Sequence, residues 1–128
     1  MLKQLYIRNY ALFAETQVTF PAGLNILTGE TGAGKSLLVG ALGLIQGKRV
    51  DNSVIFIEED KCIVEAQFAR LAPVIRQQLA AMEDFDMEEP LIIRREIRPN
   101  GKSRAFINDT PVTLDVLRQV STLLFDLH

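Results

Sequence analysis

Cysteine is almost absent from the sequence, which has only Cys62 among its 128 residues. A single cysteine excludes an internal disulfide and suits a protein kept in a reducing compartment. Cys62 lies in the alternating run CIVEAQF, which predicts a strand whose cysteine is a small buried hydrophobe. The single histidine, His128, is interpreted as a connecting residue and not as a catalyst.

An excess of positive charge is also missing. The chain has 14 lysines and arginines against 16 aspartates and glutamates, and a net charge of −2. A protein that binds nucleic acid through its whole surface is usually basic, because phosphate contacts dominate that affinity. The composition therefore leaves a local patch, or a part outside this chain, as the routes to DNA.

Long apolar runs are absent as well. The longest, LLVGALGLI at 37–45, is far below the roughly 20 residues that span a bilayer. The N-terminal MLKQLYIRNY has no extended apolar region and no cleavage-site pattern of a signal peptide. We therefore expect a cytoplasmic protein without a membrane partner.

The chain has the length and composition of one domain, covering residues 1–128. Its hydrophobic fraction of 48% is enough for a core. The patterns predict a mixed α/β fold, with a hairpin at Pro99-Asn100-Gly101. Strands are expected at 2–8, 16–20, 24–28, 54–57, 62–69, 91–97, 102–108 and 123–127. Helices are expected at 34–46, where Gly47 is the stop signal, at 73–82 and from an N-cap at Thr113.

The most informative stretch is GETGAGKS at 29–36, called the phosphate loop below. It meets the pattern G-x-x-x-x-G-K-[ST] between an apolar strand and an amphipathic helix. Glycines let the backbone approach a phosphate, and the N–H groups and helix dipole then attract it. Lys35 supplies a charge for the β- and γ-phosphates, and the Ser36 hydroxyl is a ligand for Mg²⁺. The loop predicts binding of ATP with Mg²⁺.

Hydrolysis needs more than this loop, because phosphoryl transfer also needs an acidic residue near the metal and a group that positions water. Asp126 in LLFDLH is the one acid at the end of an apolar strand-like run, and a structural role for it is favoured. A self-contained small NTPase or kinase stays open as an alternative. The D-x-x-G and N-K-x-D motifs of GTPases are absent after the loop.

Four stretches carry a family resemblance. They are MLKQLYIRNYALF, FPAGLNILTGETGAGKSLLVGALGLIQGKR, RREIRPNGKSRAFINDTPVTLDVLR and LLFDLH. Together they resemble the start of the RecN family, bacterial DNA-repair ATPases of the SMC and ABC class. The resemblance covers essentially the whole chain and is most specific at the phosphate loop.

The resemblance implies the N-terminal lobe of a P-loop ATPase head, with an antiparallel β subdomain beside the P-loop core. A coiled coil and a C-terminal lobe complete the head in that family. The implied partners are the protein's own C-terminal lobe, a second head as a homodimer, and DNA through the full-length protein. Association with the nucleoid follows when it acts on DNA. The resemblance further implies that ATP binding closes the heads and that the chain alone binds ATP without turning it over.

The resemblance also implies residues that contact the nucleotide. The loop residues implied are Gly29, Glu30, Thr31, Gly32, Ala33, Gly34, Lys35 and Ser36. Arg8 and Asn9, after the first expected strand, are candidates whose alternative role is a solvated turn. Lys48 and Arg49 follow the first helix, and Arg49 is a candidate nucleotide contact. For these two residues the alternative is a cation that stabilises the helix C-terminus.

The expected hairpin is basic. It carries Arg94, Arg95, Arg98, Lys102 and Arg104. A DNA-facing patch is one interpretation. A solvated hairpin is favoured, because no exposed aromatic residues alternate with the cations and acids lie nearby in sequence.

Overall fold

The structure of the chain is a computed structural model. It describes residues 1–11, 13–20, 32–49, 55, 57 and 59–125, with the backbone alone for 32–37. The expected strand at 24–28, the first three residues of the phosphate loop and Asp126 lie outside the described residues. No helix of the described part is long and apolar enough to cross a bilayer.

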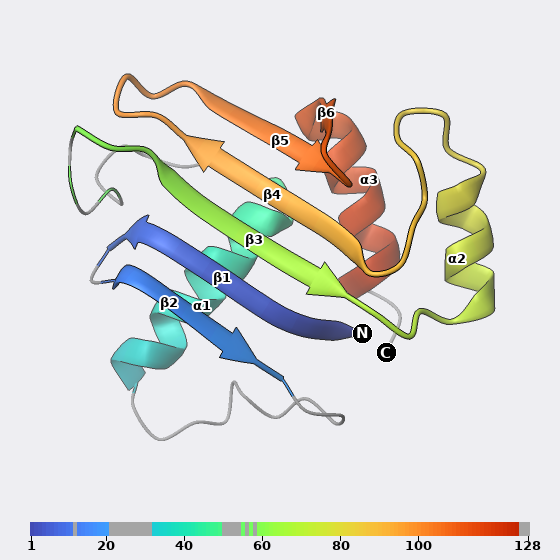
Figure 1. Cartoon of the computed structure of the whole chain (residues 1–128), viewed down its shortest axis with the longest axis horizontal. Helices are drawn as coiled ribbons and strands as arrows, with labels where there is room; N and C mark the ends of the chain where they lie inside the picture. The colour runs from blue at the N-terminus through green and yellow to red at the C-terminus, as the bar shows by residue number, and fades with distance from the viewer. Residues whose placement is uncertain (12, 21–31, 50–54, 56, 58, 126–128) are drawn as a thin grey trace.

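A six-stranded antiparallel sheet forms the body of the described chain (Figure 1). Its spatial order is β2-β1-β3-β4-β5-β6, so β3, which follows α1 in the chain, pairs with β1 of the first hairpin. The strands are β1 Leu2–Tyr10, β2 Phe13–Thr19, β3 Cys62–Phe68, β4 Leu91–Ile97, β5 Ser103–Ile107 and β6 Thr110–Val112.

Three helices accompany the sheet: α1 Gly32–Ile45, α2 Pro73–Ala80 and α3 Leu114–Phe125. Helices α1 and α3 lie behind the sheet in Figure 1, where α1 contacts β3 and β4 and α3 contacts β5. Helix α2 lies beyond the end of the sheet, beside α3. The described chain is thus a sheet with two helices on one face.

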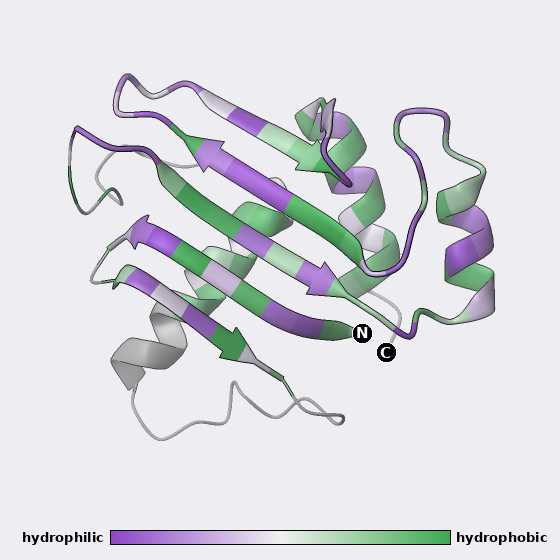
Figure 2. Cartoon of the chain, in the orientation of Figure 1, coloured by the Kyte–Doolittle hydropathy of each residue, from purple (hydrophilic) through white to green (hydrophobic). Residues whose placement is uncertain are grey.

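The core lies between this sheet face and the helices. Alternate residues of β3 and β4 are buried. Figure 2 shows that β4 is apolar in its first part and polar in its second, so the alternation along this strand is one of burial and not of hydropathy. Ile7, Val64 and Ile93 from three neighbouring strands are fully buried. The opposite face is polar and half-exposed, with Arg94 lying 4.5 Å over the ring of Phe106. Burial of one face fixes the register, because a one-residue slip would expose these side chains.

Several local predictions are confirmed. Strands β3 and β4 occupy the expected residues, and Gly101 has the positive φ of +89° that the Asn-Gly turn requires. Thr113 caps α3, since its Oγ1 accepts a hydrogen bond from the N–H of Val116 at 3.2 Å. Cys62 is fully buried, and burial raises the pKa of its thiol to about 12, with the nearby Arg95 cation opposing the shift.

Two expected strands are wrong in the described residues. Residues 123–125 belong to α3, because a short apolar run does not distinguish a strand from a buried helix end. At 54–57, Ile55 makes only an isolated bridge to Tyr10. The backbone of Ile57 is held instead by the side chain of Asn9.

The other differences are at element ends. The first hairpin is tighter than expected, because β1 continues to Tyr10 and β2 begins at Phe13. Helix α1 begins at Gly32, two residues before the expected start. The short strand β6 was not expected; it has three residues, one of them Pro111, and such a run carries little strand signal.

Candidate nucleotide-binding site

The described part of the phosphate loop is the start of helix α1. The backbone of residues 32–36 is helical, so the second half of the loop forms the first helical turn. The first turn of α1 contains no acidic residue. The free N–H groups and the positive end of the helix dipole are therefore not offset by a carboxylate of that turn, and they suit an anion.

The other end of α1 closes on Gly47. The N–H of Lys48 donates to the carbonyl of Gly43 at 3.0 Å, and the N–H of Gly47 donates to Leu44 at 3.1 Å. Gly47 has a φ of +88°, and a Cβ there would lie 2.7 Å from Cγ of Arg118. This is a Schellman ending, and it confirms the prediction that Gly47 stops the helix.

Three side chains from outside the helix also bind this end, and we call Arg95, Arg118 and Ser121 the clamp. Nη1 of Arg95 donates to the carbonyls of Leu44 at 2.9 Å and Lys48 at 3.1 Å. Nε of Arg118 donates to the carbonyl of Gly47 at 3.0 Å. The hydroxyl of Ser121 donates to the carbonyl of Ile45 at 2.9 Å. Because Arg95 comes from β4 and the other two from α3, the clamp ties α1 to both.

Arg95 is the unexpected member of the clamp. It is 1% exposed, so the prediction that the whole hairpin is solvated or faces DNA is wrong for this residue. Burial, and then the nearby Arg118 cation, lower the pKa of Arg95 from its usual value. The sequence LIIRREI contained a signal for this burial. Leu91, Ile93 and Ile97 face inward, and Arg95 lies an even number of residues from each of them, so its side chain is on the same face of the strand. The negative end of the α1 dipole lies beside the Arg95 cation.

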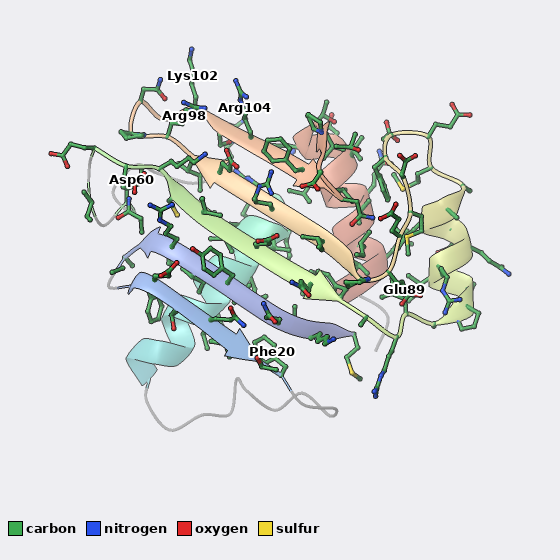
Figure 3. The ribbon with its side chains drawn as sticks, viewed as in Figure 1. Phe20, Asp60, Glu89, Arg98, Lys102 and Arg104 are labelled. Atoms are coloured by element: carbon green, nitrogen blue, oxygen red, sulfur yellow. The ribbon has the colours of Figure 1, made fainter. Side chains whose placement is uncertain are left out.

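Arg8 and Asn9 lie at the end of β1. Arg8 is exposed and forms an ion pair with Asp60 at 3.1 Å, on the turn before β3 (Figure 3). Asn9 is 2% exposed, so it is not a solvated turn residue. Its Nδ2 donates to the carbonyls of Ile57 at 2.9 Å and Asp60 at 3.1 Å, and its Oδ1 accepts from the N–H of Ile57. In this structure the Asn9 side chain fastens the turn before β3 to β1.

The end of β1 lies against α1. A Cβ added to Gly40 would collide with the hydroxyl of Tyr10, which is 7% exposed. This contact lies in the middle of α1 and involves Tyr10, whereas the exposed side chain of Arg8 pairs with Asp60 on the turn before β3.

Lys48 and Arg49 lie after the opposite end of α1. A helix of 14 residues is about 20 Å long, so both backbones are roughly that far from its first turn. Both residues are exposed. Their position favours the alternative interpretation, in which cations stabilise the C-terminal end of the helix.

The remaining hairpin cations divide into two groups. Arg94 forms ion pairs with Glu96 at 3.1 Å and Asp109 at 3.5 Å. Arg98, Lys102 and Arg104 are exposed and form no ion pair with a described residue. Among the described residues no group of three or more His, Cys, Asp or Glu could hold a metal. A hydroxyl such as that of Ser36 is a hard oxygen donor suited to Mg²⁺, which fits the predicted metal.

Comparison with known proteins identifies the class. The sequence pattern of a family described as "AAA domain" matches residues 4–102. The chain belongs to this family. Its fold is also that of an SMC-type ATPase head: an SMC ATPase structure described for ATP-driven dimerization and DNA-stimulated activation matches 95% of this chain and 78% of its own, with a TM-score of 0.70 and 18% identity. The RecF recombination mediator protein matches 91% of this chain and 29% of its own, with a TM-score of 0.68 and 19% identity.

Among curated proteins, the chain is similar to DNA repair proteins named RecN. The chain is 37% identical over 131 residues to the DNA repair protein RecN of Bacillus subtilis, covering all of this chain and 22% of that protein. It is 38% identical over 130 residues to RecN of Vibrio cholerae, covering 23% of that protein. The chain thus spans less than a quarter of the length of these two relatives and resembles their N-terminal part.

Proposed function

We propose that the chain is the ATP-binding N-terminal lobe of a RecN-like ATPase of DNA double-strand-break repair and recombination. The observation that carries this is the complete phosphate-loop pattern at the start of α1, on the fold of an SMC-type head. We also propose that the protein is cytoplasmic and associates with the nucleoid during repair, a setting that the likeness to RecN over the whole chain supports.

The phosphate loop is the site we assign to the nucleotide. In this proposal the backbone N–H groups of the phosphate loop would hold the phosphates, and Lys35 would supply a positive charge to the β- and γ-phosphates. Ser36 is the residue that would hold Mg²⁺, which neutralises phosphate charge when bound. The lack of an acid in the first turn of α1 supports this assignment, because a carboxylate there would repel the triphosphate.

The candidates outside the loop receive different weight. Arg8 stays in the proposal as a nucleotide contact, because it is exposed and lies two residues before Tyr10, whose hydroxyl meets α1 at Gly40. For Asn9 we propose an indirect role, in which it holds the turn that carries Asp60, the ion-pair partner of Arg8. For Arg49 we propose the alternative role, a cation that stabilises the C-terminal end of α1.

Hydrolysis in this proposal belongs to the whole protein. The curated relatives are more than four times longer than this chain. We infer that the chain binds ATP without turnover and that its own C-terminal lobe and a second head complete the site. ATP binding then drives head engagement, and DNA contact occurs in the assembled protein. The description of the SMC relative as an ATPase with ATP-driven dimerization supports this arrangement.

The test compares two lysines near opposite ends of α1. Lys35→Ala should weaken MgATP binding by about 10- to 100-fold, the worth of a charge-assisted hydrogen bond. Lys48→Ala, which removes the same charge beyond the far end of the helix, should change the affinity by less than about twofold. Calorimetric titration with MgATP gives both values. Equal affinity of Lys35→Ala and the parent chain would contradict the role of Lys35.

A further inference from the structure

The end of the β4–β5 hairpin carries an unusual set of charges. Residues 98–104, RPNGKSR, are called the hairpin tip; all seven are exposed, and they include three cations and no acid. Figure 3 shows Arg98, Lys102 and Arg104 together at this end of the sheet. The N-terminus lies toward the opposite end of the sheet (Figure 1).

The acids of the neighbouring turn do not neutralise the tip. Asp60 is paired with Arg8, and Glu96 is paired with Lys61 at 3.3 Å. Among the described residues of that turn Glu59 is the remaining acid, and with Asp60 it lines the same shallow hollow as Arg98 and Asn100. None of the three tip cations has a carboxylate partner within the described part of the chain. The tip therefore keeps a positive local field on a chain whose net charge is −2.

The hairpin holds two of these cations opposite one another. The N–H of Arg98 donates to the carbonyl of Lys102 at 2.8 Å, so these residues face each other across the turn. Like charges in such a cross-strand pair destabilise a hairpin by up to about 1 kcal/mol. The turn is nevertheless well formed, with Gly101 donating to the carbonyl of Arg98 at 2.9 Å and Asn100 Oδ1 accepting from the N–H of Lys102 at 3.0 Å. A fixed pair of like charges is better suited to an anionic partner than to stability.

We propose that the hairpin tip is a contact site for the phosphate backbone of double-stranded DNA. Guanidinium and ammonium groups bind phosphate oxygens and carry no sequence information there. Duplex is favoured over single strands, because Phe106, the described aromatic residue beside the tip on β5, is covered by Arg94 and is not free to stack on bases. The proposal deepens the proposed function, on which it rests, by naming where this lobe touches DNA.

The salt dependence of binding gives a quantitative test. Each phosphate contact contributes about −0.9 to the slope of log K against log salt, so three contacts predict a slope of about −3. The measurement is fluorescence anisotropy of a labelled duplex of about 20 base pairs, titrated with the 128-residue chain at salt concentrations from about 10 to 100 mM. The paired substitution Arg98→Gln with Lys102→Gln should make the slope shallower by about 2 and lower the affinity at every salt concentration.

A matched control removes the same net charge elsewhere. Lys3→Gln with Arg70→Gln takes two exposed cations from near the N-terminal end of β1. This control should leave the slope within about 0.5 of the parent. The proposal is overturned if the parent chain shows no salt-dependent duplex binding, or if the control changes the slope as much as the tip pair.

Calorimetry with MgATP on the same variants separates the two proposals. The double variant Arg98→Gln, Lys102→Gln should bind MgATP with the affinity of the parent chain. Loss of DNA binding with intact MgATP binding supports the tip as a separate contact site. If the parent chain bound DNA but not MgATP, the proposal for the hairpin tip would stand and the proposed ATP-binding function would be contradicted. Equal loss of both ligands would show misfolding of the variant and would count against the tip.

Discussion

The two ends of helix α1 are built in opposite ways. At its C-terminal end, the Schellman turn and the clamp bind five carbonyls with six hydrogen bonds, and the carbonyl of Leu44 accepts two of them. At its N-terminal end, glycines dominate and the first turn has no acid. The comparison teaches that the fold satisfies the negative end of this helix from within. The positive end is the one suited to an anion from outside.

The largest effect on stability that we predict comes from removing Arg95 from the clamp at the C-terminal end of α1. Arg95→Met should lower the free energy of unfolding by about 3 kcal/mol, because it leaves buried carbonyls without their charged donor. Urea denaturation measures the change. Arg94→Met is the control on the neighbouring residue: its ion pairs lie on the half-exposed face, so a loss below about 1 kcal/mol is expected. Equal losses for the two variants would show that the clamp does not fasten α1.

Two glycines at the C-terminal end of α1 should respond to alanine with opposite changes in the free energy of unfolding. Gly47→Ala should destabilise by about 1 to 2 kcal/mol, because a φ of +88° strains an L-residue and the new Cβ meets Arg118. Gly43→Ala should be neutral or stabilise by up to about 1 kcal/mol, because alanine favours a helix and only the flexible Lys48 side chain must move. Thermal unfolding of both variants decides, and a stabilising Gly47→Ala would contradict the ending described for α1.

A feature could be predicted from the sequence when the residues that determine it lie close together in the chain. The phosphate loop, the stop at Gly47, the Asn100-Gly101 turn and the cap at Thr113 depend on neighbours within a few residues, and a pattern is enough for each. The role of Arg95 depends on which helix end lies beneath β4, a contact 51 residues apart in sequence. The role of Asn9 likewise depends on a turn 48 residues away.

The misassigned segment at 123–125 has a different cause. Leu123 and Leu124 fit a strand or a helix equally well as a short apolar run. The choice was made by tertiary packing, in which Phe125 meets the ring of Phe68 edge-on at 5.6 Å. Such a contact between the end of α3 and the end of β3 is outside the reach of local periodicity.

The central claim is that the phosphate loop at the N-terminal end of α1 binds ATP and that this lobe alone does not hydrolyse it. Calorimetric titration of the parent chain with MgATP, followed by steady-state phosphate release on the same sample, tests both halves. The account predicts a saturable binding heat and phosphate release no faster than that of a Lys35→Ala sample. Turnover that Lys35→Ala abolishes would contradict the account, because it would require a complete catalytic site within these residues.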